Sequence, residues 1–311
     1  MGESFFSVFL QMGVLFLIVG VGYAAKKVSL MDSAFDKALS KVVLNAVLPA
    51  MILSSVLAAE TLPTLEQLAS VALASLCVYA LMLAAALIFT FVMRISPGHQ
   101  GVFRFMMLFG NVGFIGFPVT HAIFGSGALI YASIFQIPFN FLVFSLGIYF
   151  LVQDNEAGVK VRLTLKAFLS PALISCICSI CLILLGVHNV PVLGQFTDTL
   201  GSMTTPASLL VIGSSLANMP VSSLVGGARL WVASAVRLLV TPLVAMVVLR
   251  LFVGDATVVG VLVVLCGMPV ATNGTMLCYQ YGGDAKTMAQ GTFITTVFSL
   301  LSIPLLVALL G

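Results

Sequence analysis

The chain has 311 residues, of which 61% are hydrophobic and only 7% are charged, and its formal net charge at pH 7 is +3. A soluble domain carries about 25% charged residues, so this composition excludes one and requires lipid as the solvent. Backbone groups in lipid must be hydrogen-bonded internally. Apolar runs of about 20 residues without period-two alternation therefore favour membrane-spanning helices over a closed barrel.

Ten apolar runs are expected to form helices, so the predicted fold is an all-α polytopic membrane protein. In chain order they lie at approximately 5–24, 38–58, 67–93, 101–123, 128–151, 167–186, 195–217, 228–250, 256–279 and 288–310. The first is expected to be a retained helix, because Glu3 precedes it and Lys26 and Lys27 follow it, the reverse of a secretory signal. The loops are short, so no extramembrane domain is expected.

Basic residues gather in the odd-numbered loops. These loops or their edges hold Lys26, Lys27, Lys37, Lys41, Arg94, Arg104, Lys160, Arg162, Lys166, Arg229 and Lys286. The even-numbered loops have almost no basic residues, and only Arg250 lies at the edge of loop eight. Because cytoplasmic loops are enriched in Lys and Arg, the odd loops are predicted to be cytoplasmic. Both termini are then expected on the extracellular or periplasmic side of the cell membrane.

The two halves of the chain share a spacing of 157 residues. Pro206-Ala207 follows Pro49-Ala50 by 206 − 49 = 157 positions, and Tyr281-Gly282 follows Phe124-Gly125 by 281 − 124 = 157. This shared spacing predicts two five-helix repeats, 1–155 and 156–311. Because each repeat has an odd number of spans, the second repeat is expected to be inverted across the membrane. Inverted repeats are a common transporter architecture with the site near the midplane. The alternative is that these matches of Pro and Gly arose by chance in a glycine-rich chain.

Two helices carry interruptions at matching places. The sequence GNVGFIGFP occupies 110–118 and GMPVATNGT occupies 267–275, and Gly and Pro both disfavour a straight helix. A half-helix N-terminus carries about half a positive charge, and an Asn beside it can orient a carboxylate or carbonyl. The candidate binding residues are Asn111, Gly113, Gly116, Pro118, Pro269, Asn273 and Gly274. Purely structural kinks are the alternative.

A few other polar residues fall within the predicted helices. Asn45 lies one turn before Pro49, and Gln136 and Asn140 share a helix face. They are further candidates, with ordinary interhelical hydrogen bonding as the alternative. Arg237 lies about 12 Å deeper than Arg229 and is expected either to contact substrate or to bond carbonyls of the broken helices.

Charge and cysteine usage narrow the chemistry. No Asp or Glu lies in the middle of a predicted helix, so helix N-termini, amides and Arg237 favour an anionic substrate. Cys178 and Cys181 have no His or acidic neighbour, and we expect small core residues there and no metal site. No cofactor is expected, and coupling to sodium or protons is left open.

Several motifs together resemble the auxin efflux carrier family, which includes plant PIN carriers and bacterial carriers of malate or malonate. They are the 110–118 string followed by Phe124-Gly125, NAVLP at 45–49, RLLVTP at 237–242, and Pro269 with Tyr281-Gly282. The resemblance implies a fold like the bile-acid sodium symporters, with broken helices four and nine crossing. It also implies scaffold helices 1, 2, 6 and 7, and transport helices 3–5 and 8–10 that move like an elevator.

The same resemblance implies that Asn111 meets the substrate carboxylate and that Gln136 lies nearby. The chain departs from the plant carriers in its short fifth loop and in lacking an Asp/Lys pair at the start of helix three, where only Glu66 stands. Auxin itself is therefore not the expected substrate.

The predicted function is a secondary transporter of small organic anions, such as carboxylates or dicarboxylates. A channel or a substrate-sensing receptor on the same fold is one alternative. An intramembrane enzyme is another, because Gly282-Gly283-Asp284 resembles part of the GxGD motif of aspartyl proteases. The expected partners are the organic anion and membrane lipid, with no nucleic acid and with a homodimer left open.

Overall fold

The computed structural model describes residues 2–153, 170–217 and 226–310. Across these ranges the regular elements are all helices and no strand is present. Six helical stretches in them are long and apolar enough to cross a membrane: Ser33–Leu57, Leu65–Val92, Ser126–Gln153, Pro191–Ala217, Ala228–Leu249 and Ala285–Leu310. Helix α1 (Gly2–Lys27), with 26 residues, also exceeds the roughly 20 needed for a span. The prediction of an all-α, multi-pass membrane protein is confirmed.

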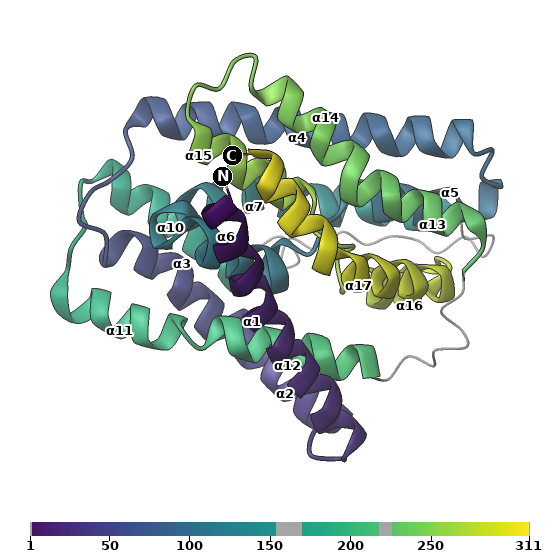
Figure 1. The fold of residues 1–311 in the computed structure, drawn as a ribbon, viewed down its shortest axis with the longest axis horizontal. Helices are drawn as coiled ribbons and strands as arrows, with labels where there is room; N and C mark the ends of the chain where they lie inside the picture. Colours follow the sequence, from purple (N-terminus) through teal and green to yellow (C-terminus); the bar gives the residue numbers. More distant parts are fainter. Residues whose placement is uncertain (1, 154–169, 218–225, 311) are drawn as a thin grey trace.

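One group of helices packs around α1 and α3. It contains α1, α2 (Ser33–Val42), α3 (Leu48–Leu57), α10 (Pro171–Leu184), α11 (Pro191–Gly201) and α12 (Thr204–Ala217). Helix α1 packs along α12, while α3 contacts both α10 and α11 (Figure 1). Lys26 and Asp36 form an ion pair at 2.8 Å, and the Ser214 hydroxyl donates to the same carboxylate at 2.8 Å. These bonds tie α1, α2 and α12 together at one end.

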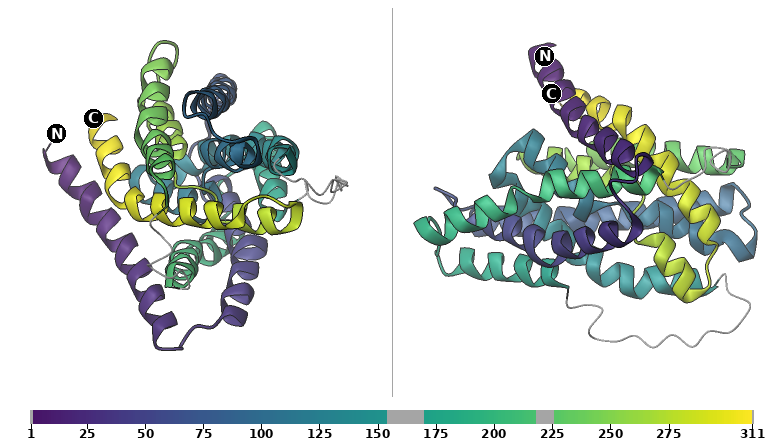
Figure 2. Two further views of the ribbon diagram at one scale, coloured as in Figure 1. Left: turned by 90° about the vertical axis from the view of Figure 1, so that its right-hand side faces the viewer. Right: turned by 90° about the horizontal axis from the view of Figure 1, so that it is seen from below.

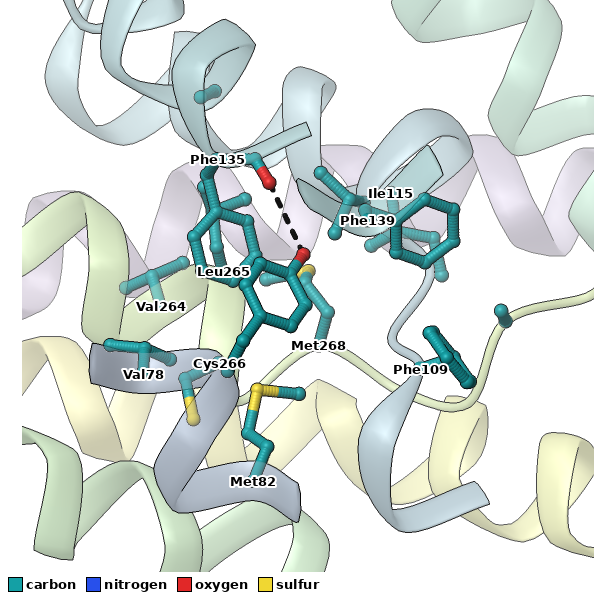
Figure 3. Packing of buried hydrophobic residues seen from close by; sticks show 14 of the residues in the cluster. Val78, Met82, Phe109, Ile115, Phe135, Phe139, Val264, Leu265, Cys266 and Met268 are labelled. Carbon is teal, nitrogen blue, oxygen red and sulfur yellow. Dashed lines mark hydrogen bonds between the residues drawn. The ribbon is translucent and has the colours of Figure 1, made fainter. Parts of the chain in front are cut away.

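The remaining helices form a second group, which has α15 (Ala256–Cys266) at its centre. They are α4 (Leu65–Val92), α5 (Pro97–Leu108), α6 (Phe117–Phe124), α7 (Leu129–Leu142), α8 (Ile148–Gln153), α13 (Ala228–Ala235), α14 (Thr241–Leu249), α16 (Gly274–Tyr281) and α17 (Ala285–Leu310). Helix α15 is apolar all round and buried throughout 258–266, so it is surrounded by protein. Figure 3 shows Leu265 of α15 packed beside Phe135 of α7, with Val78 and Met82 of α4 nearby.

Glycines allow α1 and α12 to approach closely. A Cβ at Gly213 would collide with the Val19 carbonyl oxygen and lie 2.8 Å from the Tyr23 backbone nitrogen. A Cβ at Gly20, on α1, would meet nothing within 4 Å. Close backbone packing of this kind is how membrane helices gain association energy without a hydrophobic effect.

Gly213→Ala is therefore expected to destabilise the protein by about 1–3 kcal/mol, because the added methyl group must push the two backbones apart. Gly20→Ala is the matched control and is expected to leave stability unchanged or raise it by up to about 1 kcal/mol. Thermal unfolding of the two purified variants in detergent measures both effects. Equal stability of the two variants would contradict this view of the α1–α12 contact.

Three π-helical turns precede prolines. They are η1 (Val43–Val47), η2 (Val112–Gly116) and η6 (Val236–Val240), and the helix after each has proline as its second residue: Pro49, Pro118 and Pro242. Proline has no N–H group and its ring clashes with the carbonyl one turn earlier, so a regular α-helix cannot continue through it. A wider π turn accommodates the ring, which explains why all three helices continue through their prolines.

The helix bounds differ from the expected segments mainly where charged residues lie inside a helix. The second span begins at Ser33 rather than near 38, because Asp32 caps it by accepting a hydrogen bond from the Phe35 N–H at 2.7 Å. The predicted boundary at 155/156, the start of the segment 167–186, and Lys160, Arg162 and Lys166 lie outside the described residues.

Asp284 caps the N-terminus of α17. Its carboxylate accepts hydrogen bonds from the Thr287 N–H at 3.0 Å and the Thr287 hydroxyl at 2.5 Å, and it lies 3.5 Å from His99 Nε2. Burial raises the pKa of this carboxyl, but the bonds from Thr287 and the neighbouring His99 outweigh burial, so its pKa lies below the usual value. Asp284 is therefore an ionised helix cap. A carboxyl of an aspartyl protease would instead share a proton with a second carboxyl.

The two ends of the chain lie side by side. Figures 1 and 2 show the start of α1 and the end of α17 close together in three perpendicular views. Helix α1 also packs against α17.

Candidate functional site

The two predicted interruptions contact each other directly. Helix α5 ends at Leu108 and η2 begins at Val112, while α15 ends at Cys266 and α16 begins at Gly274. Between these ends, Gly110 and Val270 form an antiparallel bridge. The Asn111 N–H donates to the Pro269 carbonyl at 2.7 Å, and the Ala271 N–H donates to the Phe109 carbonyl at 3.1 Å. Each interruption thus satisfies backbone groups that the other leaves unpaired in a water-poor interior.

Arg237 lies against this antiparallel pair. Its side chain is only 1% exposed, its Nε donates to the Met268 carbonyl at 3.2 Å, and its Nη1 donates to the Met107 carbonyl at 2.5 Å. The guanidinium therefore joins carbonyls at the edge of both interruptions. In the described part of the chain its Nη2 has no hydrogen-bond partner and no carboxylate pairs with it. A Cβ at Gly110 would collide with Nη2, so glycine allows the guanidinium to pack directly against this backbone.

A cavity of about 270 Å³ lies beside the interruptions. Its wall is formed by Leu44, Asn45, Leu48, Gly110, Asn111, Val112, Gly113, Phe114, Gln136, Phe139, Asn140, Val143, Phe144, Ser170, Pro171, Ala172, Ala271, Thr272 and Asn273. The wall contains residues of both helix groups: the region of η1, α3 and α10 on one side, and the two interruptions with α7 on the other. It includes no Asp, Glu, Lys or Arg.

Three amide side chains of this wall have buried atoms without a hydrogen-bond partner among the described residues. They are Asn111 Nδ2, Gln136 Oε1 and Asn273 Oδ1. Asn111 Oδ1 accepts from the Phe114 N–H at 3.1 Å, which fixes the orientation of that amide and leaves its NH2 group as the unpaired end. Within the part of the chain that the structure describes, no such bond fixes the side chains of Gln136 and Asn273, so either end of these two amides can face a ligand. Unpaired buried amides are costly and are uncommon in folded proteins unless they have a function.

Other predicted residues also reach the cavity. Asn140 is buried and donates through Nδ2 to the Gln136 carbonyl at 2.9 Å, which supports the turn that holds Gln136. Asn45 is exposed, donates to the Lys41 carbonyl at 2.7 Å, and lies on the opposite side of the cavity. Gly113 is part of the wall beside Leu48.

Five predicted residues do not line the cavity. Pro118 is the second residue of α6, and Pro269 contributes its carbonyl to the Asn111 N–H. Gly116 and Gly274 permit close packing, since added Cβ atoms would lie 2.9 Å from Leu265 Cδ2 and 2.8 Å from Met288 Sδ. Arg237 lies behind Gly110. These residues shape the backbone of the interruptions instead of facing the cavity.

Sequence reasoning missed part of the wall. Ser170 caps α10 by accepting from the Leu173 N–H at 3.2 Å, and the Ser-Pro pair that starts this helix was a detectable signal. The aromatic side chains Phe114, Phe139 and Phe144 have no local signal, because an apolar residue in a membrane helix faces lipid or protein equally well.

A family model described as membrane transport protein matches residues 7–307. The chain belongs to this family. The resemblance to auxin efflux carriers is thereby confirmed at the level of the family. An uncharacterized transporter of Methanocaldococcus jannaschii is 28% identical over 296 residues, which cover 94% of this chain and 95% of the relative. A second, from Methanothermobacter thermautotrophicus, is 25% identical with the same coverage. The family and these relatives are membrane transporters and not enzymes, which sets the intramembrane enzyme aside.

Proposed function

We propose that this membrane transport protein is a secondary carrier of small organic anions, such as carboxylates or dicarboxylates, which bind in the cavity beside the paired interruptions. The observation that carries the proposal is the set of unpaired amides of Asn111, Gln136 and Asn273 on one cavity wall. Amide N–H groups donate to carboxylates, and bonds to an ionised acceptor are the stronger ones.

Charge supports an anion over a cation. Arg237 lies behind Gly110 with no carboxylate partner within the described residues, and the cavity wall has no acidic side chain. An uncompensated positive charge in a low-dielectric interior raises the affinity of the adjoining cavity for anions. Asn273 also stands at the N-terminus of α16, where the helix dipole adds positive potential. The volume of about 270 Å³ lies at the small end for ligand sites and favours small acids.

The proposed architecture is ten spans in two inverted five-helix repeats, 1–155 and 156–311, with spans four and nine crossing. Element bounds support it: α6 and α16 start 274 − 117 = 157 residues apart and end 281 − 124 = 157 apart. The antiparallel hydrogen bonds between the interruptions are also what an inverted pair would make.

The proposed mechanism is elevator-type alternating access. The group of α1–α3 and α10–α12 corresponds to scaffold helices 1, 2, 6 and 7, and the group around α15 corresponds to the transport helices. The cavity has walls from both groups, so sliding one group against the other would carry a bound anion across the membrane. Such a movement needs no cofactor, and its coupling to sodium or protons is a question for transport assays.

The proposed orientation has odd loops in the cytoplasm and both termini outside the cell membrane. The adjacent ends of α1 and α17 support termini on one side.

A panel of organic acids tests the proposal. Acetate, benzoate, malonate, succinate and malate are added to the purified protein with and without sodium, since a ligand of the folded state raises its unfolding temperature. The stabilising acid is then used for counterflow in proteoliposomes. Stabilisation by an acid followed by saturable counterflow supports a carrier. Ohmic currents would identify a channel, and binding without flux would identify a receptor. The absence of stabilisation by every acid of the panel would overturn the anion assignment.

A further inference from the structure

A second, apolar groove lies on the surface between α4 and the helix α13–η6–α14. It encloses about 400 Å³ and is lined by Leu81, Ala84, Ala85, Ile88, Phe89, Val92, Met93, Val232, Val236, Val240, Thr241 and Val244. The only polar side chain in this lining is that of Thr241, whose hydroxyl already donates to the Val236 carbonyl at 3.0 Å. The groove therefore offers nothing to a polar molecule and suits hydrocarbon.

Two arginines stand at one end of this groove. Arg94 directly follows Met93, and Arg229 precedes Val232 by three positions, which places it one turn earlier on the same helix face. Figure 1 shows α4 ending and α13 beginning at the same side of the molecule. Both arginines are exposed, and among the described residues neither side chain has a hydrogen bond or ion pair. Arg94 also adopts a left-handed backbone with φ of 47°, an uncommon conformation for a residue with a Cβ.

We propose that the groove between α4 and α13–η6–α14 binds one anionic phospholipid, with an acyl chain along the groove and the headgroup at Arg94 and Arg229. An apolar channel with two unpaired cations at one mouth matches an amphiphile with a negative head. Under the proposed topology this mouth lies at the cytoplasmic leaflet, where anionic lipids attract basic residues. The assignment rests on the groove and its charges, and it stands or falls independently of which solute the protein carries.

A second copy of the chain fits this surface less well. A two-fold axis along the membrane normal would bring the same ends of both copies together. Arg94 and Arg229 of one copy would then face their counterparts, with like charges and no acid in the groove lining to separate them. A phospholipid supplies the opposite charge at that position.

The test compares binding of phosphatidylglycerol and phosphatidylcholine to the detergent-purified full-length protein by native mass spectrometry and thermal shift. Wild type is expected to prefer phosphatidylglycerol. Arg94→Gln with Arg229→Gln is expected to weaken that binding about 25-fold, because each basic residue near an anionic lipid surface contributes about fivefold. Ala84→Phe, which fills the groove from an exposed position, is expected to weaken both lipids.

The matched control is Lys37→Gln with Lys286→Gln. It removes the same charge from two exposed lysines of the predicted cytoplasmic loops, away from the groove, and is expected to leave phosphatidylglycerol binding unchanged. Equal binding of the two lipids by wild type would overturn the proposal. So would an equal loss in the lysine control, an equal thermal shift from glycerol 3-phosphate alone, or an effect of Ala84→Phe on oligomeric state without an effect on lipid binding.

Discussion

Replacing Asn111 by Asp is expected to abolish anion binding while the protein remains folded. The introduced carboxylate can still accept the Phe114 N–H bond that Asn111 Oδ1 accepts at 3.1 Å. The unpaired amide NH2 group becomes an oxygen, so a donor is lost and a repulsive charge is gained. A hydrogen bond to a charged group contributes about 1.5–3 kcal/mol, so affinity for the stabilising acid should fall at least about 100-fold once repulsion is added.

Two comparisons separate a binding role of Asn111 from a structural one. Asn111→Ala removes the cap together with the amide and is expected to lower both affinity, by about 10- to 100-fold, and stability. Asn45→Ala changes an exposed amide on the opposite wall and should have the smaller effect on binding. Acid-induced thermal shifts and counterflow measure all three variants. Wild-type affinity in Asn111→Asp would show that this amide does not meet the substrate.

Replacing Arg237 by Lys is expected to destabilise the protein by about 2 kcal/mol or more. The exchange keeps the positive charge and the burial, but a single ammonium nitrogen cannot reproduce the fork that reaches both Met107 and Met268. At least one buried carbonyl is then left without a donor, which costs about 1–3 kcal/mol. Transport should fall at least about tenfold, because the guanidinium group of Arg237 positions the backbone that carries Gly110 and Asn111.

Arg250→Lys is the matched control for Arg237. Arg250 also donates to backbone carbonyls, through Nη2 to Leu310 at 2.9 Å, but this contact is exposed at a helix end. The same exchange there should change stability by no more than about 0.5 kcal/mol, as surface substitutions usually do. Thermal unfolding in detergent, followed by counterflow, measures both variants. Equal effects of the two exchanges would show that Arg237 does not stabilise the backbone of the site.

Local chemistry made the interruptions predictable. Gly110, Gly113, Gly116 and Pro118 lie within nine residues and disfavour a regular α-helix there. The structure interrupts the helix at 109–111 and continues from Val112 as the π-helical turn η2 and then α6. The helices on either side follow from apolar length alone, because lipid leaves the backbone no other partner. The start of the second span was misplaced for the same local reason, since Asp36 and Lys37 interrupt the apolar run although they lie within α2.

The pairing of the interruptions needed the tertiary structure. The Asn111 N–H and the Pro269 carbonyl are 158 residues apart, and no local pattern specifies a 2.7 Å bond between them. Sequence left two roles open for Arg237; the fold directs its guanidinium to the carbonyls of Met107 and Met268. Gly116, Pro118 and Gly274 were predicted beside the cavity residues because they share motifs with them, yet they face the protein interior.

By itself, the sequence determined that this protein lies in the membrane, that it is helical, and where two of its helices are interrupted. These properties depend on composition and on Gly and Pro within single turns. Only the tertiary structure decided that the amides of Asn111, Gln136 and Asn273 keep unpaired atoms at one cavity, and that Ser170 and three phenylalanines complete its wall. Whether a polar atom is satisfied depends on neighbours brought from distant parts of the chain, and those neighbours are fixed only when the helices pack.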